Sequence, residues 1–211
     1  MAWPWTFATL PAGNVAASKL DDNFNAAAQL DSPAFTGTPT TTNATQAVNS
    51  SQIANTAYVD RVAVQQVVYS QVSAASSGST RMPFDGTIPQ NTEGDQYLSV
   101  TITPKSASSL LKISVTAYFW AATADALAYA LFQDSTANAI AAGFTYTGVG
   151  TASGWPAVLT KVMVSGTTSA TTFKFRAGSN GPVTVYFNST SVTQVLGSAM
   201  NSIIMVEEIG V

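Results

Sequence analysis

Carboxylates are the side chains with which this 211-residue chain could perform hydrolytic or metal chemistry. The sequence has no histidine and no cysteine, which excludes Ser-His-Asp and Cys-His catalysis, thiolate metal ligands and disulfides. Two carboxylates are enough to hydrolyse a glycosidic bond, and several in one loop can bind Ca²⁺. The acidic residues of the C-terminal part of the chain are Asp85, Glu93, Asp95, Asp125, Asp134, Glu207 and Glu208.

These acids lack the arrangement of a catalytic pair or of a dedicated metal loop. Asp85, Glu93 and Asp95 stand among glycines and prolines, where carboxylates usually cap turns, and their spacing is not that of an EF-hand. Glu207 and Glu208 are adjacent, so in a strand they would face opposite sides and could not act on one bond. We therefore expect no enzyme, no metal site and no cofactor, with a small glycan depolymerase as the open alternative.

Composition narrows the function classes further. Charged residues make up 9% of the chain and hydrophobic residues 46%. The net charge is -3, and the basic residues are scattered along the sequence. A chain without a basic patch is not expected to bind nucleic acid. No uninterrupted apolar run approaches the roughly 18 to 20 residues that a membrane helix needs, so we expect no membrane insertion.

Residues 81–211 have the alternation of a β domain. Apolar and polar side chains alternate in 97–103 and again in 111–120, which is typical of half-buried strands. A hairpin turn is predicted at Gly178-Ser179-Asn180-Gly181. The further candidate strands are 126–133, 139–146, 157–165, 171–177, 183–188, 192–196 and 201–208. The spacing predicts an antiparallel β-sandwich or jelly roll.

Aromatic side chains of this domain are candidates for carbohydrate recognition, because rings stack on sugar faces. In the predicted strand 111–120, Phe119 lies on the apolar side, which leaves Tyr118 and Trp120 on the opposite side. Trp155 is predicted to lie in an exposed loop. The alternatives are that a neighbouring protomer covers the face of Tyr118 and Trp120 and that Trp155 packs in the core.

Residues 1–30 are predicted to form an extended arm followed by a short helix. Trp3, Trp5 and Phe7 concentrate aromatic contact area at the start, and Leu10 follows them. Such anchors are typical of docking segments, so we expect this arm to bind a partner surface. The alternative is that the arm folds back on its own C-terminal domain.

Residues 31–80 combine an extended stretch rich in Pro and Thr with a helix predicted from about residue 49 to 75. The helix carries no single unbroken heptad register, so a short trimeric coiled coil and a monomeric amphipathic helix fit equally well. The residues of a trimer seam would be Ile53, Ala57, Tyr58, Val64 and Val67.

Three segments resemble parts of bacteriophage tail-fibre proteins. Residues 31–63, DSPAFTGTPTTTNATQAVNSSQIANTAYVDRVA, are similar to a fibre module of the approximate form DSPxFTGxPTxPTxxxGxNxxQIATTAFVxxxV. The stretch TFATLPAGNVAASKLDDNFNAA resembles the start of many phage fibre proteins. The features DGTIPQNTEGDQYLSV, ALFQD, FKFRAGSNGPVTVYFN and SIIMVEEIGV resemble a C-terminal fibre domain that is similar to the trimeric tumour-necrosis-factor jelly roll.

The resemblance implies a homotrimeric structural protein of a virion, most simply a tail fibre. Residues 1–30 would attach it to tail, portal-adaptor or baseplate proteins, and 31–80 would connect and trimerise the chains. Residues 81–211 would form a knob that binds a host-surface glycan or protein. The protein would be assembled in the host cytoplasm and reside in the virion. A head or collar fibre, or an adaptor without a receptor role, is the alternative placement.

Overall fold

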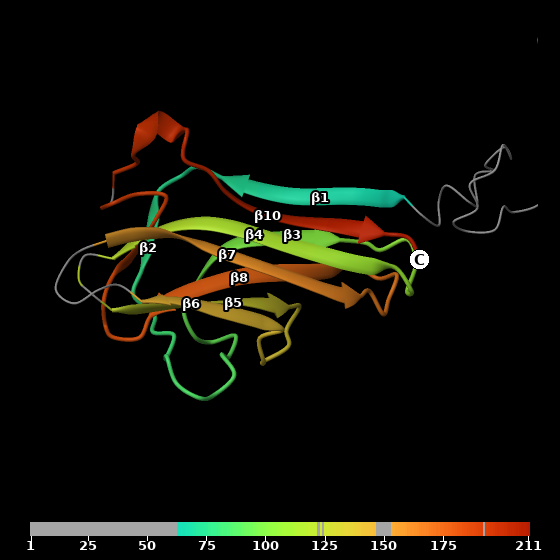
Figure 1. Ribbon diagram of the computed structural model, residues 1–211, viewed down its shortest axis with the longest axis horizontal. Helices are drawn as coiled ribbons and strands as arrows, with labels where there is room; N and C mark the ends of the chain where they lie inside the picture. The colour runs from blue at the N-terminus through green and yellow to red at the C-terminus, as the bar shows by residue number, and fades with distance from the viewer. Residues whose placement is uncertain (1–62, 122, 124, 147–152, 192) are drawn as a thin grey trace, which may run out of the picture. The chain divides into compact units, whose positions relative to one another are not determined.

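The computed structural model describes residues 63–211, apart from 122, 124, 147–152 and 192 (Figure 1). Several predictions from the sequence lie outside the described residues. They concern the arm with Trp3, Trp5, Phe7 and Leu10, the fibre module up to residue 62, and the stalk residues Ile53, Ala57 and Tyr58.

The described residues form strands and one short 3₁₀ turn, with no α-helix among them. The elements in chain order are β1 (Val64–Val72), β2 (Ser76–Gly78), β3 (Asp95–Ile102), β4 (Leu110–Ala121), β5 (Ala126–Gln133), β6 (Ala141–Tyr146), β7 (Ser153–Val164), β8 (Thr171–Ser179), β9 (Val185–Phe187), η2 (Leu196–Ser198) and β10 (Ser202–Ile209). The predicted mainly β architecture is confirmed for this part of the chain.

The strands make two curled antiparallel sheets (Figure 1). In the first sheet the order is β1-β10-β4-β9-β2, and β7 pairs with the other edge of β4. The second sheet has the order β3-β8-β5-β6. Strand β1 contacts β3, and β7 contacts β6, so the two sheets approach each other along both sides.

The main hydrophobic core lies between the sheets. Along β4 the side chains alternate, and Ile113, Val115 and Phe119 are buried while their neighbours face outward. The second sheet contributes Phe173 and Phe175 from β8, which are also buried. Each such side chain contributes about 1.5 to 3 kcal/mol through removal of apolar surface from water. The period of two in the sequence therefore determines both the strands and the faces they bury.

A second, smaller core lies on the outward side of the second sheet. Strand β5 is buried on both faces, because Met82 covers the side chains of Ala128, Ala130 and Phe132. Met82 belongs to the connection between β2 and β3 and donates its backbone N–H to the carbonyl of Ser179 at 3.0 Å. This connection is therefore fixed against β5 and β8 rather than free in solvent.

The helix predicted through residues 64–75 is wrong for its described part, because Val64–Val72 is strand β1. Val68 pairs with Val206 of β10, and Val68 and Val72 pack against the core. The β-branched residues favour this pairing over a helix. Val64 and Val67, predicted for a coiled-coil seam, instead stand exposed on the strand. The predicted division at residue 80 consequently cuts through a sheet to which β1 and β2 belong.

Most predicted strands of residues 81–211 are confirmed with ends that shift by a few residues, but two predictions are wrong. Strands β8 and β9 lie in different sheets, so the segment at Gly178 is no hairpin turn. A Cβ on Gly178 would lie 2.4 Å from the carbonyl oxygen of Thr80, so this glycine permits a close approach of two backbones. The described part of 192–196 forms no strand, only one isolated bridge between Ser189 and Gln194.

The adjacent glutamates of β10 face opposite sides, as the sequence predicts. Glu207 points outward and forms an ion pair with Lys112, with 2.7 Å between Oε2 and Nζ. Glu208 points inward and is fully buried. Burial alone would raise the pKa of Glu208, but donors from Gln66 at 2.5 Å, Lys105 N at 2.8 Å and Ser106 N at 3.2 Å together hold it below its ordinary value.

The buried carboxylate of Glu208 should make folding stability depend on pH. The pKa of Glu208 is lower in the folded than in the unfolded chain. Its contribution to folding stability is therefore fully present above about pH 4.5 and is lost as the pH falls through the pKa of the folded state. We expect Glu208→Gln to lower the free energy of unfolding at neutral pH by about 1 to 3 kcal/mol and to flatten its acid dependence. Urea unfolding from neutral pH down to about pH 3 measures both effects.

Glu207→Gln is the matched control for this experiment. Its ion pair with Lys112 is partly exposed on the outer side of the sheet, and pairs near the surface contribute about 0 to 1 kcal/mol. A Glu208→Gln protein with the same stability and the same acid slope as the control would contradict the role given to the buried carboxylate.

Candidate functional site

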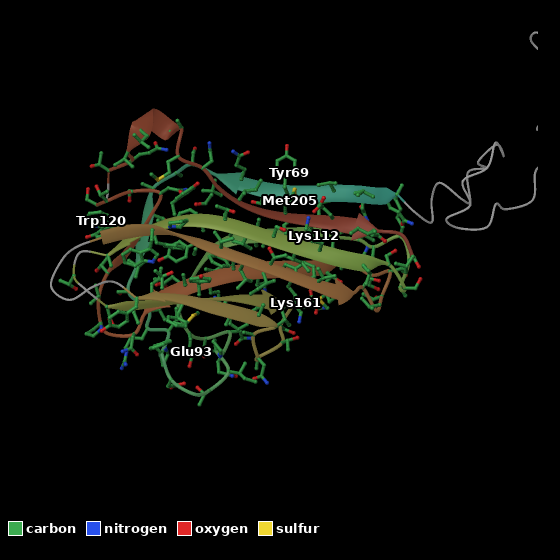
Figure 2. All side chains as sticks on the ribbon, viewed as in Figure 1. Tyr69, Glu93, Lys112, Trp120, Lys161 and Met205 are labelled. Carbon is green, nitrogen blue, oxygen red and sulfur yellow. The ribbon has the colours of Figure 1, made fainter. Side chains whose placement is uncertain are left out.

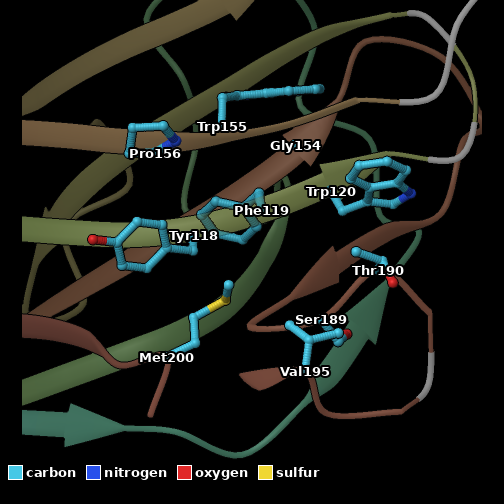
Figure 3. Close-up of a pocket in the computed structure, with 10 residues that line it drawn as sticks. All are labelled: Tyr118, Phe119, Trp120, Gly154, Trp155, Pro156, Ser189, Thr190, Val195 and Met200. Carbon is cyan, nitrogen blue, oxygen red and sulfur yellow. The ribbon is translucent and has the colours of Figure 1, made fainter. Parts of the chain in front are cut away.

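The three aromatic residues proposed for receptor contact line one pocket of about 260 Å³ (Figure 3). The pocket lies where the end of β4 runs beside the start of β7. The register pairs Tyr118 with Pro156 and Trp120 with Gly154. The full lining is Tyr118, Phe119, Trp120, Gly154, Trp155, Pro156, Ser189, Thr190, Val195 and Met200.

Tyr118 and Trp120 lie on the side of β4 opposite to Phe119, as predicted. Trp155 differs from its prediction, because it lies within β7 rather than in an exposed loop. It pairs with Phe119 and is half-buried against the main core. Its Nε1 is buried and has no hydrogen-bond partner among the described residues. Trp155 therefore forms part of the pocket wall from the core side.

The segment that closes the pocket is held by a chain of hydrogen bonds to the first sheet. Ser202 Oγ donates to Asn188 Oδ1 at 2.7 Å and accepts from the backbone N–H of Tyr118 at 3.0 Å. Asn188 donates its backbone N–H to the carbonyl of Tyr118 at 3.0 Å and its side-chain amide N–H to the carbonyl of Val72 at 2.8 Å. Because buried polar groups need such partners, this network fixes Asn188 and Ser202, at the two ends of the segment, beside Tyr118.

Sequence reasoning did not find the pocket residues that this segment supplies, namely Ser189, Thr190, Val195 and Met200. They show no periodicity and reach β4 only through the fold. The lining offers rings, a thioether and hydroxyls but no carboxylate, so it suits stacking and packing rather than acid-base chemistry.

Three of the carboxylates considered for catalysis or metal binding accept hydrogen bonds from backbone N–H groups, Asp85 and Glu93 within turns and Asp95 from a distant segment. Asp85 accepts from Thr87 N at 2.8 Å, Glu93 from Gln90 N at 2.9 Å, and Asp95 from Thr80 N at 2.9 Å. Within the described residues, no three carboxylates gather closely enough to hold a metal ion.

The outer side of the first sheet, beyond the pocket, carries many apolar side chains, with hydroxyls and one ion pair among them. We call it the apolar face. It is made by the outward side chains of β1, β10, β4 and β7, and Tyr69, Met205 and Lys112 are labelled on it in Figure 2. Its apolar members are Val67, Tyr69, Leu110, Tyr118, Pro156, Val158, Val162, Val164, Ile203, Met205 and Ile209.

The cross-strand register shows how apolar and hydroxyl side chains are distributed on this face. One row runs from Tyr69 through Met205 and Ser114 to Thr160. Tyr69 is 64% exposed and Val158, two rungs along β7, is 59% exposed. At the outward positions of these four strands, the only charged side chains are Lys112 and Glu207, which neutralise each other. The face therefore presents apolar area with no net charge.

The described residues contain no helix long and apolar enough to cross a lipid bilayer.

Comparison with known proteins identifies no family for this chain. No family model matches the sequence, and no curated protein matches it. Among solved structures, Eiger TNF from S. frugiperda has a TM-score of 0.37 and 8% identity, over 68% of this chain and 93% of that one. Dimeric latent PorU from Porphyromonas gingivalis has a TM-score of 0.32 and 10% identity, over 67% and 13%. The Gx strain of infectious bursal disease virus has a TM-score of 0.28 and 12% identity, over 68% and 38%. Likenesses of this size carry no argument about function.

Substitution of Gly154, which lines the pocket, tests how the pocket is packed. A Cβ on Gly154 would lie 2.8 Å from Cε3 of Trp120 and 3.1 Å from the carbonyl oxygen of Phe119. We therefore expect Gly154→Ala to displace the Trp120 ring, change tryptophan emission and lower the free energy of unfolding by about 1 kcal/mol or more. Fluorescence spectra and urea unfolding measure the two effects.

Gly86→Ala is the matched control, because no atom lies within 4 Å of its added Cβ. Its emission and stability should stay within about 0.5 kcal/mol of the parent protein. Equal behaviour of the two variants would show that Trp120 does not pack on β7 as described.

Proposed function

We propose that the chain is a homotrimeric structural protein of a bacteriophage virion, most simply a tail fibre. Residues 1–30 attach it to other virion proteins of the tail, portal adaptor or baseplate. The β domain is a knob of the jelly-roll type, similar to the tumour-necrosis-factor fold, which presents a host-binding surface. The observation that carries the proposal is the apolar face of the first sheet.

Self-association explains the apolar face better than solvent exposure does. Exposed apolar side chains of β1, β4 and β7 gather on this one side of the sheet, and gathered exposed apolar residues mark interaction sites. The single ion pair at Lys112 and Glu207 leaves no unpaired charge to be buried when another copy covers it. A second copy of the same chain offers the same low charge and the same apolar surface. A ring around a threefold axis forms when one part of this surface contacts a different part on the next copy and the rotation between copies closes after three of them.

The sequence supports the virion setting. The module at residues 31–63 and the stretch from Thr6 resemble phage fibre proteins, and they precede the β domain in the order that a fibre requires. The strand structure of Val64–Val72 shortens the region available for a helical stalk. The β domain then supplies most of the threefold contact, and any helix before residue 63 adds to it.

Two roles compete for the aromatic pocket at the end of the apolar face. Tyr118 belongs to the face that self-association would cover, whereas Trp120 and Trp155 line the pocket beside it. We assign the pocket to receptor contact, with a sugar ring or an apolar protein side chain as its occupant, because its lining combines aromatic rings with hydroxyls. Tyr118 then serves both surfaces.

A charged substitution on the apolar face should prevent assembly. The parent protein should have about three times the chain mass of 21.9 kDa in light scattering. Val158→Glu should shift the mass towards a monomer, because assembly would bury an unpaired carboxylate, which costs several kcal/mol. The same variant should fail to be incorporated into purified phage particles.

Ile88→Glu is the matched control. Ile88 is 55% exposed, close to the 59% of Val158, but it lies in the connection before β3 and not on the apolar face. It should leave the mass and the incorporation unchanged. A parent protein that is monomeric throughout, or that is absent from purified particles, would overturn the proposal.

A further inference from the structure

A second pocket, of about 180 Å³, lies on the outward side of the second sheet. It is formed between the connection before β3 and the strands β5 and β6, on the side that carries the smaller core. Its lining is Pro83, Phe84, Asp85, Thr87, Pro89, Ala128, Ala142, Gly143 and Phe144. None of these residues belongs to the apolar face or to the aromatic pocket, so the hollow is a separate feature.

Two phenyl rings form the wall of this second pocket. Phe84 and Phe144 have ring centroids 4.5 Å apart with 43° between their planes. They remain 47% and 56% exposed, respectively, so much of their π surface faces solvent. Beneath them the floor is made of small residues, Ala128, Ala142 and Gly143. The rings therefore offer a shallow aromatic surface on a floor that leaves room for a ligand.

The connection that carries Phe84 is held in place before any ligand arrives. Phe84 donates its backbone N–H to Asn180 Oδ1 at 2.9 Å, and the carbonyl of Pro89 accepts from Ala139 N at 2.9 Å. Pro83 and Pro89 further restrict the backbone. Binding to a preformed site avoids the cost of ordering a loop.

A carboxylate stands beside the rings. Asp85 Oδ1 accepts from Thr87 N at 2.8 Å and from Thr87 Oγ1 at 2.6 Å. These hydrogen bonds hold the pKa of Asp85 below its ordinary value, so the group is negatively charged at neutral pH. The hydroxyl of Thr87 donates its one proton to Asp85, so it can act towards a ligand only as an acceptor. No Lys or Arg is among the residues that line this pocket.

We propose that this pocket binds an organic cation, namely a methylated or alkyl ammonium group. Aromatic faces attract cations through their quadrupole, and a carboxylate adds direct charge complementarity. An anion would be repelled by Asp85. A neutral sugar would need side-chain donors as well as acceptors, and the lining offers acceptors and rings. This inference goes beyond the proposed function and does not depend on it, because the pocket lies on the sheet opposite to the apolar face.

The test compares choline with 3,3-dimethyl-1-butanol, which has the same shape but carries carbon in place of the charged nitrogen. NMR titration of the full-length protein should show choline binding with shifts confined to Phe84, Phe144 and their neighbours. The neutral analogue should bind about tenfold more weakly, because it lacks the cation–π and carboxylate terms.

Two variants and one control assign the binding to this site. Asp85→Asn, which removes the charge, and Phe144→Leu, which removes a ring from an exposed position, should each weaken choline binding by about fivefold or more. Tyr146→Leu changes an exposed ring on the same strand outside the pocket and should leave the affinity unchanged. Urea unfolding of each variant verifies that it is folded.

Several results would overturn the inference. Equal affinity for choline and its neutral analogue would make the pocket merely apolar, and unchanged affinity in both pocket variants would place binding elsewhere. Absence of choline binding, or preferential binding of methyl glucoside, would exclude a cation site. Each of these outcomes can occur whether the protein is a monomer or a trimer, so the result is separable from the assembly proposal.

Discussion

Strand β4 pairs with β10 and β9 along one edge and with β7 along the other, and this register decides which side chains of the first sheet face the core. Ile113, Val115 and Phe119 face inward, whereas Thr116 and Tyr118 face outward. A slip by one residue would exchange these sets and place Lys112 and Tyr118 in the core. The large free energy of burying the inward set makes such a slip prohibitive. Burial of the inward side chains therefore also determines which side chains of β4 face outward.

The composition of the apolar face follows from this alternation of inward and outward residues. The outward residues of β1, β10 and β7 follow the same register as β4, so Tyr69, Met205 and Val158 become parts of one surface although they lie far apart in the sequence. The adjacent residues Glu207 and Glu208 show this alternation. Glu207 faces outward and forms the ion pair with Lys112, whereas Glu208 faces inward and accepts hydrogen bonds from backbone donors. The two sides of the sheet thus have different chemistry, with core packing on one and a candidate interface on the other.

The second sheet is organised differently and carries the other candidate function. Strand β5 is buried on both faces because Met82 and its connection cover the outward side. At the rim of that cover the rings of Phe84 and Phe144 stay open beside Asp85. The two surfaces can therefore act independently, since covering one sheet leaves the outward side of the other accessible.

Sequence alone predicts much of the β domain, because alternation reports directly on burial. The strands around Leu98 and Ile113, and the opposite facing of Tyr118 and Phe119, followed from a period of two. A spacing of three places Val64 and Val67 on one face of a helix but on opposite faces of a regular strand. Both are exposed on β1, whose pairing with β10 has a register shift between Val64 and Gln66 that the sequence does not indicate. The sequence around Gly178 has the pattern of a turn, whereas the close approach of Gly178 to Thr80 depends on tertiary structure. Met200, Phe84 and Phe144 could not be assigned to pockets for the same reason: nothing local marks which distant strand they will meet.

The claim that a second copy covers the apolar face is tested most directly by hydroxyl-radical footprinting of the intact protein. Tyr69 on the apolar face and Tyr146 on β6 are 64% and 65% exposed in the single chain, so they form an internal pair with the same chemistry. If a second copy covers the face, Tyr69 is strongly protected from oxidation at working concentration while Tyr146 reacts at the rate of an exposed tyrosine. Equal oxidation of the two residues would contradict this claim.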